Sequence, residues 1–80
     1  MRLTLYGRPG CHLCDDMRAA LEAARARHGF SLEEVDVDAS PELVQAYGAL
    51  IPVLVCAGRE VCHYFFDPDA LEQALANPRG

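Results

Sequence analysis

The sequence predicts an α/β domain with one mixed four-stranded sheet and helices on both faces. Three observations lead to this prediction. Short apolar segments alternate with segments of helical periodicity. Two of the predicted helices begin with a capping residue followed by a proline and an acid, and two apolar segments near the end of the chain are separated by a turn. The expected order is β-α-β-α-β-β-α. The first β-α-β unit joins parallel strands by a right-handed crossover, and the last two strands form an antiparallel hairpin. With 80 residues, the chain is expected to form a single domain over residues 1–80.

The first three elements follow from periodicity and from the residues that end each segment. Arg2–Tyr6 is short and apolar and is followed by Gly7, which is typical of a strand. In Cys11–His28, apolar side chains recur every three or four residues and alanine is frequent, so we expect a helix that ends at Gly29. Ser31–Val37 alternates apolar with acidic residues and predicts the second strand.

A second, short helix is predicted from its start signal. Ser40 is a favourable N-cap, Pro41 suits the first helical position, and Glu42 places an acid in the first turn. The helix is expected to end near Gly48. Three of its side chains are expected to face inward: Leu43, Val44 and Tyr47.

A hairpin and a last helix are predicted in the C-terminal part. Ile51–Cys56 is almost continuously apolar, which is typical of a central strand buried on both faces. Residues 57–60 predict a turn and Val61–Phe66 the returning strand. Asp67-Pro68-Asp69 predicts the start of a helix that packs through Leu71, Ala74 and Leu75, and residues 77–80 predict a frayed tail.

Composition and charge exclude several classes of protein. The chain is 51% hydrophobic and 24% charged with a mean hydropathy of +0.02, which excludes a disordered or collagen-like chain. Its net charge is −5 and every basic residue is arginine, so neither nucleic acid nor an anionic membrane is expected as a partner. No apolar segment approaches the ~20 residues that span a bilayer. The N-terminal segment is short and is broken early by Gly7 and Pro9, so it does not read as a secretion signal and we expect a cytoplasmic protein. We also expect a monomer.

A Cys-x-x-Cys motif at the start of the first helix carries the main functional prediction. Cys11 and Cys14 lie where the segment after the first strand gives way to the helix. At a helix N-terminus, free backbone N–H groups and the helix dipole stabilise a thiolate, which is the nucleophile in disulfide exchange. Cys14, one turn later and packed against the sheet, can reach the Cys11 sulfur but not a bulky external disulfide. We therefore expect Cys11 to attack and Cys14 to resolve the mixed disulfide.

The charged neighbours of this motif are expected to tune its reduction potential. A protonated His12 favours the Cys11 thiolate and makes the disulfide more oxidising. Asp15 and Asp16 act in the opposite direction, although they also suit the first turn of a helix. The sequence does not decide which effect is larger, and a solvated spacer is the alternative interpretation of His12.

The segment LYGRPGCHLC, the element order and Ile51-Pro52 resemble the glutaredoxin branch of the thioredoxin-fold proteins, especially the compact bacterial glutaredoxin-like proteins. The resemblance covers nearly the whole chain and implies a thioredoxin fold and a thiol–disulfide oxidoreductase. It also implies that Pro52 follows a cis peptide bond and faces the two cysteines, and that the backbone of Ile51 pairs with an extended substrate. Arg8 matches a basic residue of the family, which implies stabilisation of the thiolate or contact with the substrate; a solvated loop charge is the alternative.

One stretch departs from the glutaredoxin pattern. Glutaredoxins have a Gly-Gly-x-Asp stretch after the fourth strand that helps to hold glutathione, whereas this chain has His63-Tyr64-Phe65-Phe66-Asp67. Asp67 can keep the helix-capping position, but the glycines that allow close backbone approach are absent. The expected substrate is a disulfide in a protein or in a small thiol, and the electron donor is left open between a thioredoxin reductase-type enzyme and glutathione. The expected cycle requires no metal and no organic cofactor.

Cys56 and Cys62 flank the predicted hairpin turn. If the turn is two residues long, we expect Cys56 to lie opposite Val61 and the two thiols to face opposite sides of the sheet; a β-bulge reverses this. We interpret both as small core residues, because free cysteine is among the most buried residue types. The alternatives are a second redox pair or metal ligands.

Two other functions use the same cysteine motif. In the first, Cys11 and Cys14 hold zinc or a soft metal together with Cys62 or His63. In the second, the domain senses redox state or binds a partner in a chaperone-like way without turnover.

Four aromatic residues are expected in the core or a groove: Phe30, Tyr47, Phe65 and Phe66. His28 and His63 are expected at the surface. Tyr6 matches an aromatic residue of the family and is expected to pack at the end of its strand.

Overall fold

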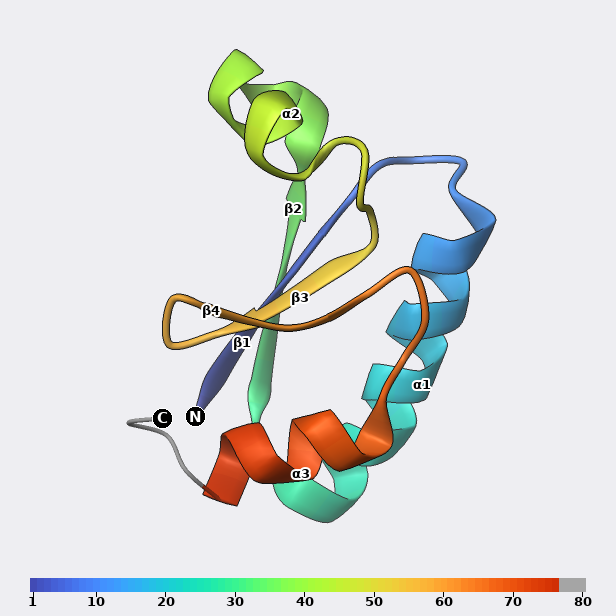
Figure 1. The fold of residues 1–80 in the computed structure, drawn as a ribbon. Helices are drawn as coiled ribbons and strands as arrows, with labels where there is room; N and C mark the ends of the chain where they lie inside the picture. Colours follow the sequence, from blue (N-terminus) through green and yellow to red (C-terminus); the bar gives the residue numbers. More distant parts are fainter. Residues whose placement is uncertain (77–80) are drawn as a thin grey trace.

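The computed structural model describes residues 1–76, which contain four strands, three α-helices and one 3₁₀ turn (Figure 1). In chain order these are β1 (Arg2–Gly7), α1 (His12–His28), β2 (Ser31–Asp36), η1 (Val37–Ala39), α2 (Pro41–Tyr47), β3 (Val53–Cys56), β4 (Arg59–His63) and α3 (Pro68–Ala76). The strand order is β2-β1-β3-β4, with β1 and β2 parallel and β3 antiparallel to both of its neighbours. The predicted α/β class with a mixed four-stranded sheet is confirmed, and the predicted tail lies outside the described residues.

The core lies on the sheet face that α1 and α3 cover (Figure 1). Leu3 and Leu5 of β1 and Leu54 of β3 are at most 2% exposed there. α3 contributes Leu71, and α1 contributes a buried stripe that consists of Cys14, Met17, Leu21 and Ala24. Each fully buried leucine or methionine contributes about 1.5–3 kcal/mol to the stability of the fold, so the stripe fixes α1 and the turn that carries the cysteine motif. None of the helices within residues 1–76 has the length and apolarity needed to cross a membrane.

α2 lies beyond the end of the sheet rather than over its centre (Figure 1). Ser40 caps it, because the hydroxyl accepts the N–H of Leu43 at 3.2 Å, as the start signal predicts. Tyr47 stacks on Tyr6 of β1 with ring centroids 4.1 Å apart, which attaches the helix to the sheet. The prediction that Val44 faces inward is wrong: it is 41% exposed, because only one side of this seven-residue helix meets the fold.

The β3–β4 hairpin turns over two residues. Ala57 and Gly58 have φ values of 53° and 79°, a combination typical of a type I′ turn. Cys56 therefore lies opposite Arg59, and both the predicted turn over residues 57–60 and the pairing of Cys56 with Val61 are wrong.

A β-bulge follows in the pairing of β3 with β4. The register shifts between Leu54 and Val55, so Cys62 lies opposite Leu54. Because Leu54 and Cys56 occupy alternate positions of one strand, Cys56 and Cys62 face the same side of the sheet. They are 5% and 8% exposed within the core, which confirms the interpretation as core residues.

β4 ends at His63, three residues earlier than predicted. Tyr64 has a φ of 63°, a left-handed conformation that ends the strand. The Tyr64 amide donates to the carbonyl of Pro52 at 2.9 Å, and its hydroxyl donates to the carbonyl of Ala49 at 2.9 Å. These hydrogen bonds hold the segment after β4 against the loop that precedes β3.

β2 ends at Asp36, one residue earlier than predicted. The Asp36 carboxylate accepts the N–H of Asp38 at 2.9 Å and so caps η1. Val37 is fully buried although it has left the strand. Because Asp36 pairs with Gly7, the turn places Asp38 at the end of the sheet where β1 leads into the cysteine motif.

Candidate functional site

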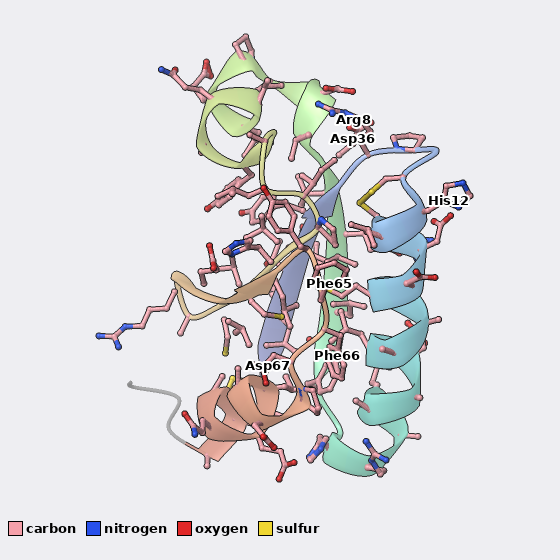
Figure 2. The ribbon with its side chains drawn as sticks, turned by 45° about the vertical axis from the view of Figure 1, so that its right-hand side comes forward. Arg8, His12, Asp36, Phe65, Phe66 and Asp67 are labelled. Atoms are coloured by element: carbon pink, nitrogen blue, oxygen red, sulfur yellow. A yellow bond between two sulfur atoms is a disulfide. The ribbon has the colours of Figure 1, made fainter. Side chains whose placement is uncertain are left out.

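Cys11 and Cys14 form a disulfide at the N-terminus of α1 (Figure 2). Their Cα atoms are 5.1 Å apart. Cys11 is the N-cap residue and is partly exposed, whereas Cys14 is 1% exposed in the first turn. The two cysteines therefore differ in their access to solvent, as the sequence predicts.

The start of α1 directs the backbone N–H of Cys14 at the Cys11 sulfur. The N–H of Cys14 donates to Cys11 Sγ at 3.1 Å, and the carbonyl of Cys11 accepts the N–H of Asp15 at 3.0 Å. α1 continues for 17 residues, so its dipole places partial positive charge at this end. Both effects favour a thiolate over a thiol at Cys11 once the disulfide is opened.

Gly7, at the end of β1, provides the space in which Cys14 packs. A Cβ at position 7 would lie 2.9 Å from Cys14 Sγ and 3.4 Å from Cys14 Cβ. The first distance is well below van der Waals contact, so only a residue without a Cβ leaves Cys14 undisturbed. The sequence indicates only that Gly7 ends a strand, and the contact with Cys14 emerges from the structure.

Ile51 and Pro52 are joined by a cis peptide bond in the loop before β3, which begins at Val53, two residues later than predicted. Pro52 is fully buried and Ile51 is partly exposed. Tyr6 pairs with Val53 in an antiparallel register, so the next position places Pro52 beside Gly7. The loop and the cysteine motif therefore border the same end of β1.

Arg8 forms a two-hydrogen-bond ion pair with Asp38 of η1. Its Nε and Nη2 donate to the two carboxylate oxygens at 3.1 and 2.9 Å. The hydrogen bonds to Asp38 are the main cause of a raised pKa at Arg8. Figure 2 shows Arg8 and Asp36 at the end of the sheet near the disulfide. The guanidinium is bound to a carboxylate, which neither sequence interpretation of Arg8 includes.

A cavity of about 370 Å³ lies between β2 and the start of α1 and reaches Cys14. Arg18 donates to Glu34 and, at 2.9 Å, to Asp15. These hydrogen bonds, that to Glu34 most strongly, raise the pKa of Arg18. The sequence predicts that the negative charge of Asp15 disfavours the thiolate. Arg18 partly compensates this charge. The charged residues that line the cavity are Arg8, Arg18, Glu34 and Asp36.

His12 is the first residue of α1 and is exposed. Figure 2 shows its ring directed outward from the helix, away from the disulfide. Its effect on the reduction potential stays a prediction.

The segment after β4 exposes one aromatic side chain and caps α3. Phe65 is 70% exposed, so its predicted place in the core or a groove is wrong; the left-handed Tyr64 before it redirects the chain. Phe66 packs against the core. Asp67 accepts the N–H of Ala70 at 3.0 Å and keeps the capping position, as predicted.

The further ligands of the metal-binding alternative lie on β4. Cys62 packs in the core, and Nδ1 of the exposed His63 is 2.7 Å from the Glu60 carboxylate. Within residues 1–76, no group of three His, Cys, Asp or Glu side chains is arranged to hold a metal ion.

Cys62 is expected to resist alkylation in the folded protein. Burial is the main cause that raises the pKa of its thiol above the ordinary 9.0, so the folded protein retains this proton at a pH where the unfolded chain releases it. By linkage, this contribution to stability is complete below pH 9 and is lost as the pH rises through the folded value. In a variant that retains only Cys62, iodoacetamide labelling at pH 9 should be about 100-fold slower in buffer than in urea. Equal rates in buffer and urea would contradict this expectation.

The ion pairs around the site were not singled out by the sequence. Arg8 and Asp38 are 30 positions apart, and Arg18 and Glu34 are 16 apart. One signal was available: the carboxyl ends of parallel strands are adjacent, so a base just after β1 and an acid just after β2 are expected to be near neighbours.

Comparison with known proteins bears on both fold and family. The family model described as Glutaredoxin-like domain (DUF836) matches residues 2–76. The chain is similar to the solution structure of protein Ne2328 from Nitrosomonas europaea, with 39% identity and a TM-score of 0.82 over 90% of this chain and 87% of that one. It is also similar to target protein XcR50 from X. campestris, with 41% identity and a TM-score of 0.74 over 92% and 95%. No curated protein matches the chain significantly.

A more distant structure shows the fold alone. Thioredoxin 1 from Thermosipho africanus TCF52B has 13% identity and a TM-score of 0.62 over the full length of both chains. The predicted thioredoxin fold is therefore confirmed, and with the paired cysteines it supports a redox function in general terms. Because the family match extends over residues 2–76, the chain belongs to the glutaredoxin-like domain family.

Proposed function

We propose that the protein is a thiol–disulfide oxidoreductase that exchanges a dithiol and a disulfide at Cys11 and Cys14. The observation that carries this proposal is the unequal placement of the two sulfur atoms. Cys11 caps α1, is partly exposed and accepts a backbone N–H at its sulfur, whereas Cys14 is 1% exposed one turn later. Such an arrangement provides one attacking thiolate and one protected thiol.

The proposed reaction has two exchange steps. The Cys11 thiolate attacks one sulfur of a substrate disulfide, a Cys11–substrate disulfide forms, and the other substrate sulfur leaves as a thiolate. Cys14, as its thiolate, then attacks Cys11 Sγ, the intramolecular disulfide forms, and the second substrate sulfur leaves. The substrate gains two electrons and the protein dithiol loses two. A thioredoxin reductase-type enzyme or glutathione is the proposed donor that returns them.

Ile51 is proposed to align the substrate. Within residues 1–76 its N–H and C=O form no backbone hydrogen bond, and the neighbouring Pro52 carbonyl is already bonded to Tyr64. An extended substrate segment can pair with the free groups of Ile51 as an added strand. We infer a disulfide in a protein or in a small thiol as the substrate.

A redox titration tests the proposed function. The protein is equilibrated in buffers of varied ratio of reduced to oxidised glutathione, quenched with acid, labelled with an alkylating mass tag and read as intact mass. We expect a two-electron transition confined to Cys11 and Cys14 that disappears in Cys11→Ser. A Cys56→Ala/Cys62→Ala variant is the matched control and should keep the transition. A motif that remains reduced at every ratio, or a transition that the control loses, would refute the proposal.

A further inference from the structure

Asp38 forms an ion pair with the guanidinium of Arg8, which precedes the cysteine motif. Arg8 is three residues before Cys11, and its Nε and Nη2 donate to the two carboxylate oxygens of Asp38 at 3.1 and 2.9 Å, which compensates its charge and uses one of its two bidentate edges. Asp38 is itself held in η1, where its N–H donates to Asp36 at 2.9 Å. A two-hydrogen-bond geometry of this kind is also the one in which arginine binds a ligand carboxylate.

The surroundings of Arg8 add further negative charge. Arg8 and Cys14 line the same cavity, and the carboxylates of Glu34 and Asp36 line it from β2. Arg18, the other base there, donates to Glu34 and Asp15. Both arginines are therefore paired with carboxylates, and a ligand carboxylate that enters must compete with them.

We propose that Asp38 is a specificity-determining residue that makes the active site discriminate against disulfides that carry carboxylates. Asp38 is covalently part of the chain, so it competes for Arg8 at a high effective concentration. Neutral and cationic disulfides do not need the guanidinium and are not disfavoured. The inference rests on the proposed function and concerns the substrate class of the same site.

The test compares three small disulfides of different charge: glutathione disulfide, which carries carboxylates, neutral hydroxyethyl disulfide and cationic cystamine. Protein is reduced with dithiothreitol, freed of it, and mixed with an excess of each disulfide. The Cys11 thiolate and the Cys14 thiol are oxidised to the intramolecular disulfide while one small disulfide is reduced to two thiols, so no further reactant is needed. Acid-quenched intact mass gives the single-turnover rate.

The Asp38→Asn variant is expected to change the charge preference. Its rate with glutathione disulfide relative to cystamine should rise about fivefold, because the freed guanidinium can bind the carboxylate of the ligand. Asp16→Asn, which removes the same charge from the first turns of α1 without freeing Arg8, is the matched control and should change the ratio less than twofold. Equal changes in the two variants would overturn the proposal, as would equal acceleration of all three disulfides by Asp38→Asn.

Removal of Arg8 provides an independent check. In the Arg8→Gln background, Asp38→Asn should change the ratio less than twofold, because no guanidinium is freed. A fivefold change in that background would overturn the proposal. Failure of the proposed function is distinguishable, since the unmodified protein would then reduce none of the three disulfides. Asp38 is 54% exposed at its side chain, and thermal unfolding of each variant verifies that the fold is kept.

Discussion

The Cys11→Ser variant is expected to lose disulfide reduction by about a thousandfold or more, while Cys14→Ser is expected to accumulate a mixed disulfide. A serine hydroxyl does not ionise near neutral pH, so the helix N-terminus has no anion to stabilise in the first variant. In the second variant the Cys11 sulfur still accepts an N–H from residue 14 and can attack, but no thiol follows one turn later to release the adduct. Intact mass after reaction with hydroxyethyl disulfide separates these outcomes.

The site of the adduct is decisive for the assignment of roles. Peptide mapping of Cys14→Ser should place the adduct on Cys11 and leave Cys56 and Cys62 unmodified, because both are buried in the core. The reverse pattern, in which Cys11→Ser forms an adduct on Cys14 faster than Cys14→Ser forms one on Cys11, would exchange the two roles. It would also require that solvent reaches a side chain that is 1% exposed.

Gly7→Ala is expected to destabilise the protein by about 1–3 kcal/mol and to slow closure of the disulfide. The backbone of Gly7 does not lie in the positive-φ region, so alanine adopts its conformation without strain. The cost is steric, because the new Cβ would lie 2.9 Å from Cys14 Sγ. Urea unfolding measures the change in free energy, and quenched mass tagging measures the rate at which Cys11 and Cys14 close.

A double-mutant cycle separates this contact from a general effect at position 7. In a Cys14→Ala background the sulfur is absent, and Gly7→Ala should cost less than about 1 kcal/mol. Alanine at position 7 adopts its backbone conformation without strain in both backgrounds. The difference between the two changes in unfolding free energy therefore reports the contact with Cys14 Sγ. Equal costs would show that Gly7 is required for a reason other than Cys14.

Features that depend on neighbouring residues were predictable from the sequence. The helix over α1, its start at the cysteine motif and the cap at Ser40 rely on spacings of a few residues, and the structure has each of them. The parallel β1–β2 pair followed from the β-α-β order, because the crossover permits only one arrangement. These local features suffice to place Cys11 and Cys14 at the start of α1.

Features that depend on distant residues or on single unusual dihedral angles were not predictable. Phe65 belongs to an apolar segment whose composition predicts a strand, yet the left-handed conformation of Tyr64 ends β4 before it. That conformation is held by hydrogen bonds to Ala49 and Pro52, which the sequence separates by 15 and 12 positions. The bulge in β4 likewise reversed the side of the sheet that Cys62 faces.

Tyr64 couples the stability of the fold to the order of the proposed substrate edge. Its backbone N–H donates to the Pro52 carbonyl and its side-chain hydroxyl donates to the Ala49 carbonyl, so this residue braces the loop on both sides of Ile51. A substitution there changes the folding free energy and the rigidity of the proposed substrate edge together. Substitutions near Phe65 can therefore alter substrate preference more freely than substitutions at Tyr64. At Tyr64, a site that adapts to more substrates would also lose order in the edge that is proposed to align the reacting disulfide.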